Sequence, residues 1–192
     1  FEAIDNTPLF LPIKINGKKP IGSKNNLTQK ELYEVHTNKQ VTLKDGTTYR
    51  LMKDFTHFEL RLKYTDNIVC IDVDGILENS DCCLTDVWGI PCFKEYFLKC
   101  PYTLSRNKQL PHFYFKLDGL EREGLKDTMV DCFNDFKGDL LINHCWEKKE
   151  GNKIHNYTDD LPYLHIDEIK HLFKPKTFEK REPSVKVEYT RN

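Results

Sequence analysis

No apolar run in this sequence comes near the ~18 residues that a membrane-spanning helix needs. The N-terminus lacks a charged-then-apolar leader, and the first residue is Phe1 rather than methionine. We therefore expect no membrane association, and we expect the chain to be a fragment of a longer protein or a processed product. Its 192 residues, 39% hydrophobic and 31% charged, are enough for one sizeable folded domain.

No two cysteines are spaced as Cys-x-x-Cys, and their number is odd. The seven are Cys70, Cys82, Cys83, Cys92, Cys100, Cys132 and Cys145. A chain of this length needs no cross-links, so we expect free thiols in a reducing, intracellular compartment. The group from Cys82 to Cys100 could in principle hold zinc, but its spacing matches no standard pattern. Buried small hydrophobes are the favoured interpretation.

Strong net charge is also missing, since the chain carries −1 overall. The balance is uneven along the chain: +3 over residues 1–67, −5 over 68–139 and +1 over 140–192. An acidic centre between mildly basic flanks suits a cation site beside a track for a polyanion, although scattered surface charge gives the same totals.

Local patterns predict an α+β domain with a largely antiparallel sheet flanked by helices, spanning residues 1–173. Residues 1–26 are expected to form an extended arm, and the charged residues 174–192 a tail or linker. The expected helices cover 29–37, which begins with the capping box TQKE, a stretch within 88–99 after Pro91, and 166–173. The expected strands cover 57–64, 67–75 and 111–119, with hairpins around Asp45-Gly46 and Glu150-Gly151.

The segment IVCIDVDG, residues 68–75, places two carboxylates in an apolar strand. Side chains alternate across a strand, so Asp72 and Asp74 share one face. Two neighbouring carboxylates repel each other unless a cation binds them, and hard oxygen ligands suit Mg²⁺ or Mn²⁺. Alternatively, both acids simply end a strand in solvent. The apolar residues before them favour the metal site.

Other stretches offer the partners that such a site needs for phosphate chemistry. Asp139 in KGDLLIN follows a glycine and is expected to open an apolar strand. In SRNKQLPHFYF, His112 begins a strand whose other face is aromatic, and a loop with Ser105, Arg106 and Lys108 precedes it. These four side chains are candidates for binding a triphosphate.

The order IDVDG, then SRNKQLPHFYF, then GDLLIN resembles the archaeo-eukaryotic primase superfamily, in particular the N-terminal primase domain of the primase-helicases of large DNA viruses. The resemblance covers roughly residues 30–170. It implies a primase-type catalytic core with an RRM-like sheet and two Mg²⁺ or Mn²⁺ ions on Asp72, Asp74 and Asp139. It further implies that His112, with Ser105 near it, contacts the nucleotide's phosphates. The family's second motif usually contains a glycine, which is absent between Ser105 and His112, so Arg106 and Lys108 are expected to share this contact.

The activity implied by this resemblance is primer synthesis on single-stranded DNA from nucleoside triphosphates, with a helicase domain C-terminal in the full-length chain and a site of action in a virus-infected host cell. Several side chains are candidates for contacting the template through charge or stacking. They are Lys18, Lys19, Lys24, Lys148, Lys149, Lys153, Trp146 and Tyr157. For each of them, a solvated charge or a half-buried aromatic is the simpler interpretation.

Two alternatives use the same residues differently. IDVDG also resembles the loop of haloacid-dehalogenase-type phosphatases, in which Asp72 would be the nucleophile and Asp74 the general acid. That motif normally opens its domain, whereas here 71 residues precede Asp72, and the later acid should end a strand. The second alternative is a primase-like module that binds nucleic acid without catalysis. Stacked acids would weaken such binding.

Overall fold

The computed structural model describes residues 10–14, 19–20, 27–54, 57–79, 81–105, 107–143, 154–158 and 160–180, the backbone alone for 10–14, 19–20 and 57–59. Within these ranges the protein is a mixed α+β structure with a mostly antiparallel sheet and few helices, which confirms the predicted fold class at this level. The described helices are all too short or too polar to cross a membrane.

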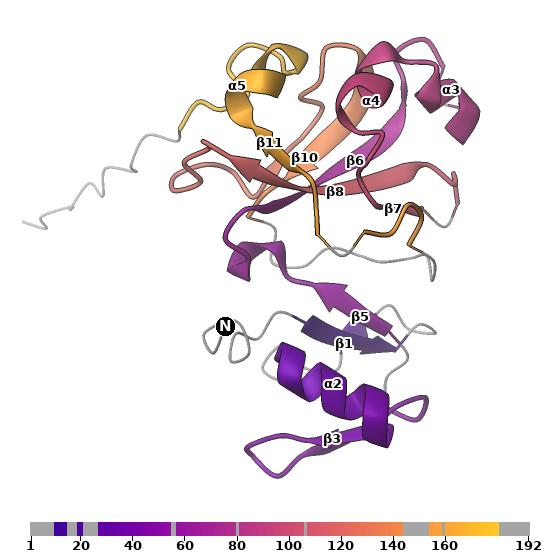
Figure 1. Ribbon diagram of the computed structural model, residues 1–192, viewed down its shortest axis with the longest axis vertical. Helices are drawn as coiled ribbons and strands as arrows, with labels where there is room; N and C mark the ends of the chain where they lie inside the picture. The colour runs from indigo at the N-terminus through magenta and orange to yellow at the C-terminus, as the bar shows by residue number, and fades with distance from the viewer. Residues whose placement is uncertain are drawn as a thin grey trace, which may run out of the picture.

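The main sheet has six strands, and β6 (Ile68–Ile76) lies at its centre (Figure 1). Its antiparallel neighbours are β8 (Pro111–Asp118) and β10 (Phe136–Leu141), and β9 (Thr128–Met129) follows β10. The other side of β8 pairs with β7 (Tyr102–Leu104), which is antiparallel, and with β11 (Tyr163–His165), which is parallel. The central position of β6 confirms what its apolar residues on both faces predicted.

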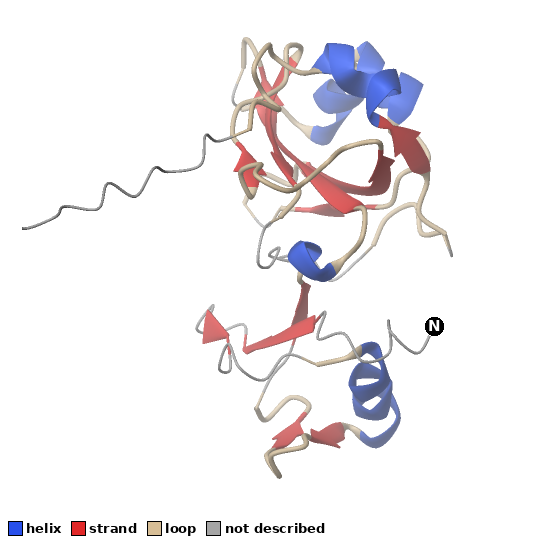
Figure 2. Ribbon diagram, turned by 90° about the vertical axis from the view of Figure 1, so that its left-hand side faces the viewer, coloured by secondary structure: helices blue, strands red, loops and turns tan. Residues whose placement is uncertain are grey.

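Helices cover one face of this sheet. They are α3 (Leu84–Trp88), α4 (Pro91–Tyr96), α5 (Ile166–Ile169) and the 3₁₀ turn η3 (Lys170–Leu172), and both views place them on the side away from the N-terminal elements (Figures 1 and 2). Phe93 of α4 packs on Phe113 of β8 at 5.5 Å and on Phe136 of β10 at 4.6 Å between ring centroids. Aromatic packing between the helices and the sheet thus contributes to holding β8 and β10 on either side of β6.

The N-terminal third forms smaller units with a separate apolar cluster. The strands β1 (Phe10–Lys14), β2 (Lys19–Pro20) and β5 (His57–Leu60) make one antiparallel sheet. The helix α2 (Gln29–Asn38) packs with the hairpin of β3 (Gln40–Thr42) and β4 (Thr48–Arg50) around Val35, Val41 and Tyr49. The Thr28–Glu31 capping box and the Asp45-Gly46 hairpin are confirmed, and the described parts of residues 1–26 contribute two of these strands.

Several predicted boundaries were wrong. The strand expected over 57–64 ends at Leu60, and the chain then forms the 3₁₀ turn η2 (Leu62–Tyr64). Asp139 lies inside β10, which begins at Phe136, because the aromatic side chain there packs in the core and extends the strand backward. The hairpin expected at Glu150-Gly151 lies partly outside the described residues. His155 after it forms a bridge with Tyr102 rather than with β10.

The segment from Lys174 to Lys180 packs against the main domain. Phe178 contacts Phe173 edge to face, with ring centroids 4.9 Å apart, and joins the rim of the main core. Lys180 forms an ion pair with Glu121 at 2.9 Å. The region expected to be a charged tail therefore begins with seven residues that lie on the folded domain.

Gly138 allows β10 to approach β6 directly beside the acidic residues. A Cβ at this position would lie 2.7 Å from the Asp72 carbonyl oxygen and 2.8 Å from the Phe136 ring, closer than real Cβ contacts allow. We predict that Gly138→Ala lowers the free energy of unfolding by about 1–3 kcal/mol, because the two strands must move apart. Urea unfolding measures this loss. Lys137→Ala, an exposed neighbour, is the matched control, and an equal effect of both variants would contradict the close-approach explanation.

Candidate metal centre

Three neighbouring strands place one polar residue each in a single row. In the register of the sheet, Asp72 of β6 faces His112 of β8 on one side and Asp139 of β10 on the other. All three side chains point to the face opposite the helices, since Ile71, Phe113 and Leu140 next to them lie in the core under α4. His112 Nε2 and Asp72 Oδ1 lie 3.0 Å apart, within ion-pairing distance. The row joins residues that are far apart in the sequence.

A β-bulge brings Asp74 into the same site. Val73 pairs with Gly138 and Gly75 with Lys137, so that Asp74 has no opposite residue on β10. Such a bulge bends the strand and re-aims the extra side chain. Asp74 is exposed while Val73 and Gly75 beside it are buried, which leaves its carboxylate at the rim of the site.

The three aspartates fit a divalent cation. One carboxylate oxygen from each of Asp72, Asp74 and Asp139 lies within 4.8 Å of the other two. Carboxylate oxygens are the ligands that Mg²⁺ and Mn²⁺ prefer, and a shared cation needs donors converging in this way. The convergence that the sequence predicted is therefore present, and the donor set is chemically suited to the expected ions.

Crowding of like charges leaves this site electrostatically strained without a cation. Burial, together with the charges of Asp72 and Asp139, raises the pKa of Asp74 to about 6, although Lys108 and His112 act against this rise. Burial also raises the pKa of Asp139, with Asp72 and Asp131 adding to it and the backbone amide of Asp131 opposing it. A cation between the carboxylates would remove the repulsion that adds to the effect of burial on both pKa values.

Of the loop residues expected to bind phosphate beside the acids, the structure brings only Lys108 to them among those it describes. Lys108 reaches the site and donates a hydrogen bond from Nζ to the carbonyl oxygen of Asp74 at 3.3 Å. Ser105 begins the loop between β7 and β8, where its hydroxyl accepts a hydrogen bond from the Leu110 amide at 3.1 Å, so it shapes the loop that carries Lys108. Arg106 lies outside the described residues.

Sequence reasoning missed Asp131, whose backbone amide donates a hydrogen bond to Asp139 Oδ1 at 2.9 Å. Asp131 lies in the turn between β9 and β10 and has a left-handed backbone with φ of 53°. This amide fixes one oxygen of Asp139 and leaves the other to a ligand. The only sequence signal was an aspartate in the Val130-Asp131 turn, which does not reveal a contact made by its backbone.

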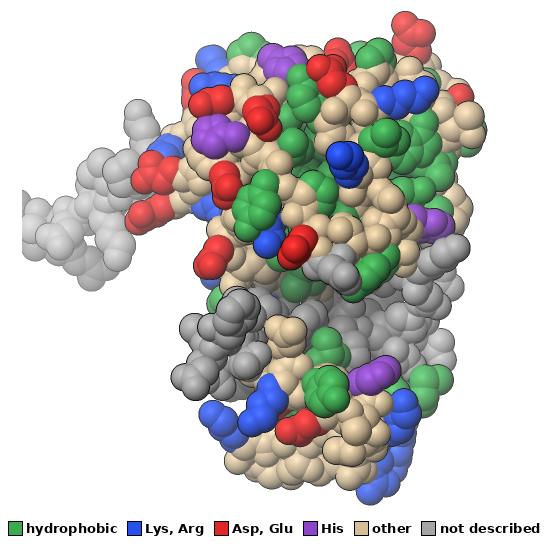
Figure 3. Space-filling model, viewed as in Figure 1, with side chains coloured by type: hydrophobic (Ala, Val, Ile, Leu, Met, Phe, Trp, Pro, Cys, Tyr) green, Lys and Arg blue, Asp and Glu red, His purple; other side chains and the backbone are tan. Residues whose placement is uncertain are grey.

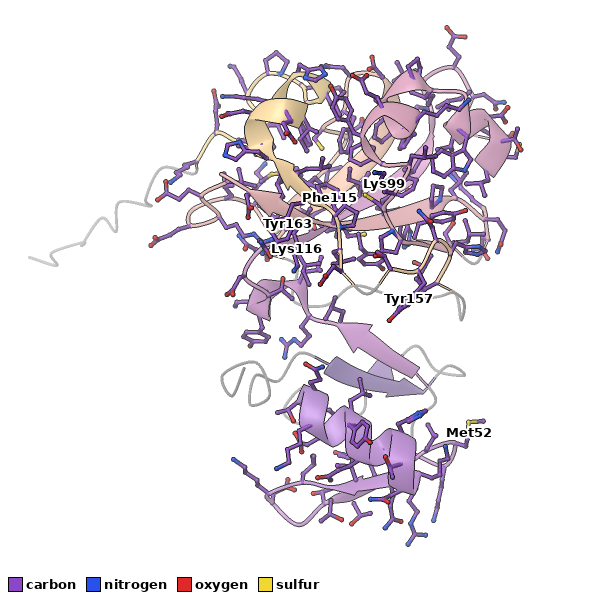
Figure 4. All side chains as sticks on the ribbon, in the orientation of Figure 1. Met52, Lys99, Phe115, Lys116, Tyr157 and Tyr163 are labelled. Carbon is purple, nitrogen blue, oxygen red and sulfur yellow. The ribbon has the colours of Figure 1, made fainter. Side chains whose placement is uncertain are left out.

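The candidate template contacts are mostly not described. Lys18, Lys24, Trp146, Lys148, Lys149 and Lys153 lie outside the described residues, as does the side chain of Lys19. Tyr157 is 72% exposed and lies below β7 on the side of the sheet away from the helices (Figure 4). On the face drawn in Figure 3, most acidic side chains lie on the upper part, interspersed with Lys and Arg, whereas at the lower end Lys and Arg outnumber the acids.

The described cysteines are free thiols. Burial raises the pKa of Cys92, Cys100 and Cys132 to about 12, which keeps these thiols neutral and favours their role as small apolar residues over metal binding.

Comparison with known proteins found no matching family model, curated protein or solved structure. The site's chemistry is that of three hard oxygen donors with a histidine and a lysine on one side. Such a set can hold a divalent cation next to an anionic phosphate.

We predict that Asp74 makes the metal-free protein less stable as the pH rises from about 4 to about 6. In the unfolded chain this carboxyl titrates near 3.8 and in the folded protein near 6, so between these values the folded state holds the proton more tightly. Asp74→Asn removes the charge. It should match the wild type near pH 4 and exceed it by roughly 1 kcal/mol above pH 6, a value reduced for the partial exposure of the group.

Chemical unfolding of both proteins in a chelator at several pH values measures this difference. A difference that stays constant from pH 4 to pH 7 would contradict the assigned cause.

Proposed function

We propose that this chain is the catalytic domain of a DNA primase or primase-polymerase, which joins nucleotides along a single-stranded DNA template. The proposal includes a primase-type core, a helicase domain in the full-length chain and replication of a large DNA virus as its setting. The single observation that carries it is the row of His112, Asp72 and Asp139 across three adjacent strands, with Asp74 brought beside it by a bulge.

Each part of this row suits one task in nucleotidyl transfer. The 3′-oxygen of the growing strand bonds to the α-phosphorus of the incoming nucleotide, the bond to pyrophosphate breaks, and the hydroxyl proton passes to solvent. Two Mg²⁺ or Mn²⁺ ions on the aspartates would neutralise the charge that develops on the attacking and leaving oxygens. His112 and Lys108 lie on the β8 side of the acids, where they can donate to the oxygens of the triphosphate.

The positions of these side chains are set before any substrate arrives. His112 is held by Asp72, Asp139 by the Asp131 amide, and Lys108 by a loop that Ser105 closes. Because polar groups that are already oriented need little rearrangement during the reaction, this arrangement favours catalysis over binding alone.

The phosphatase alternative is less well supported. It expects the later acid at the end of a strand, whereas Asp139 lies inside β10, and β6 has antiparallel neighbours on both sides. A binding module without catalysis gains nothing from gathering three acids where burial, and then the charges of Asp72 and Asp139, raise the pKa of Asp74.

We predict that Asp72→Asn and Asp139→Asn each reduce primer synthesis at least about a hundredfold, because each removes a charge that the transition state requires. The assay supplies single-stranded DNA, ribo- or deoxynucleoside triphosphates and Mg²⁺ or Mn²⁺, and it follows the products on a denaturing gel. Asp160→Asn, which removes one exposed acid elsewhere, is the matched control and should retain activity.

Wild-type activity in the Asp72→Asn, Asp139→Asn double variant would end the proposal. Hydrolysis of an aryl phosphate by the wild type, lost in Asp72→Asn, without any primer synthesis would favour the phosphatase instead.

We also predict that Mn²⁺ with a nucleoside triphosphate raises the melting temperature of the wild type by several degrees and leaves that of the Asp72→Asn, Asp139→Asn variant nearly unchanged. Differential scanning fluorimetry measures both, with Asp160→Asn as the control. A rise of equal size in all three proteins would place the cation elsewhere.

A further inference from the structure

A lysine-lined cavity lies beside the acidic site, next to β9, the edge strand of the main sheet. It is open, has a volume of about 460 Å³, and lies between the loop of residues 126–132 and the segment 174–180. Its charged lining residues are Lys126, Lys174, Lys176, Lys180, Asp131 and Glu179. The lining lysines therefore exceed the lining acids by two. We call this feature the lysine cavity.

The lysine cavity and the metal centre share a wall. Asp131 lines the cavity, and its backbone amide binds Asp139 Oδ1 at 2.9 Å. The next residue, Cys132, accepts a hydrogen bond from the Lys174 amide at 2.7 Å, which ties the 174–180 segment to the same turn. An anion in the cavity would therefore lie next to the acids of the site.

The segment that supplies most of the lysines is held in place by other contacts. Lys180 pairs with Glu121, Phe178 packs on Phe173, and the Thr177 hydroxyl donates to the Lys174 carbonyl oxygen at 2.7 Å. For Lys126, Lys174 and Lys176, the structure shows no ion pair with any described residue. Three ammonium groups are thus available to a ligand at a site whose backbone is already ordered.

The in-line geometry of phosphoryl transfer indicates which ligand the lysine cavity binds. In phosphoryl transfer the attacking and leaving oxygens lie on opposite sides of the phosphorus, roughly in line. His112 and Lys108 mark the β8 side of the acids as the triphosphate side. The attacking 3′-hydroxyl must then approach from the β10 side, and the lysine cavity lies beyond β10.

We propose that the lysine cavity binds the backbone phosphates of the growing strand and so delivers its 3′-hydroxyl to the acids. This inference rests on the proposed function and names the site of its second substrate. Lysine ammonium groups neutralise nucleic-acid phosphates without reading their sequence, which suits a strand whose sequence changes with the template.

Binding of a fluorescent primer–template DNA, measured by anisotropy in a chelator, tests this inference. Lys174→Gln with Lys176→Gln should raise the Kd about tenfold near 0.1 M salt and lower the slope of log K against log salt by about 1 to 2. Lys174→Arg with Lys176→Arg, which keeps the charge, should bind like the wild type. The matched control is Lys94→Gln with Lys99→Gln, and it should change the Kd less than twofold. Both lysines are exposed; Lys94 lies in α4, and Lys99 (Figure 4) lies three residues after the end of this helix.

Primer extension at saturating primer–template should give the glutamine variant a nucleotide KM within about twofold of the wild type, since the cavity is separate from the triphosphate side. The inference is overturned if the glutamine variant and the control change the Kd equally. It is overturned too if single-stranded template loses as much affinity as primer–template, or if the nucleotide KM rises while the primer–template Kd does not.

The proposed function and this inference can fail separately. Lysine-dependent binding of primer–template by a protein that synthesises nothing would refute the catalytic proposal alone. If the protein synthesises primers but its primer–template Kd does not change when these lysines are replaced, only the assignment of the lysine cavity is refuted.

Discussion

The register between β8, β6 and β10 is the constraint on which the site depends. Side chains alternate with a period of two, so a shift of one residue in either pairing would move His112 or Asp139 to the helix-covered face. The aromatic residues Phe113 and Phe136 resist such a shift, because it would bring them out of the core. The burial that stabilises one face of the sheet thus decides which polar groups meet on the other.

The three neighbouring carboxylates repel one another and so oppose folding. The local structure limits this unfavourable free energy. Asp74 leaves the regular ladder through a bulge and reaches the rim, and the Asp131 amide compensates part of the charge on Asp139. The remaining strain is visible in the raised pKa of Asp74, and it is the property that makes a cation stabilising here. The same groups therefore link the stability of the domain to its ligand.

Local patterns were sufficient for much of the fold. The capping box at Thr28 and the Asp45-Gly46 turn act through contacts within a few residues, so their elements were predicted close to their observed bounds. The apolar run around Ile71 was also predicted close to its bounds, because a central strand is apolar on both faces. The helix α3 and the short strand β7 were missed. Both are stabilised by packing on β6 and β8 rather than by their own periodicity.

The sequence by itself predicted that Asp72 and Asp74 lie on the same side of one strand, because side chains alternate along a regular strand. At Asp74 the bulge interrupts this alternation. The sequence also placed His112 and Asp139 on strands, although Asp139 lies inside β10 rather than at its start. Only the tertiary structure decided that the strands of these residues are neighbours, that a bulge carries Asp74, and that the 174–180 segment lies against the Asp131 turn. These contacts join residues tens of positions apart, and their energy comes from packing and register that no short stretch of sequence contains.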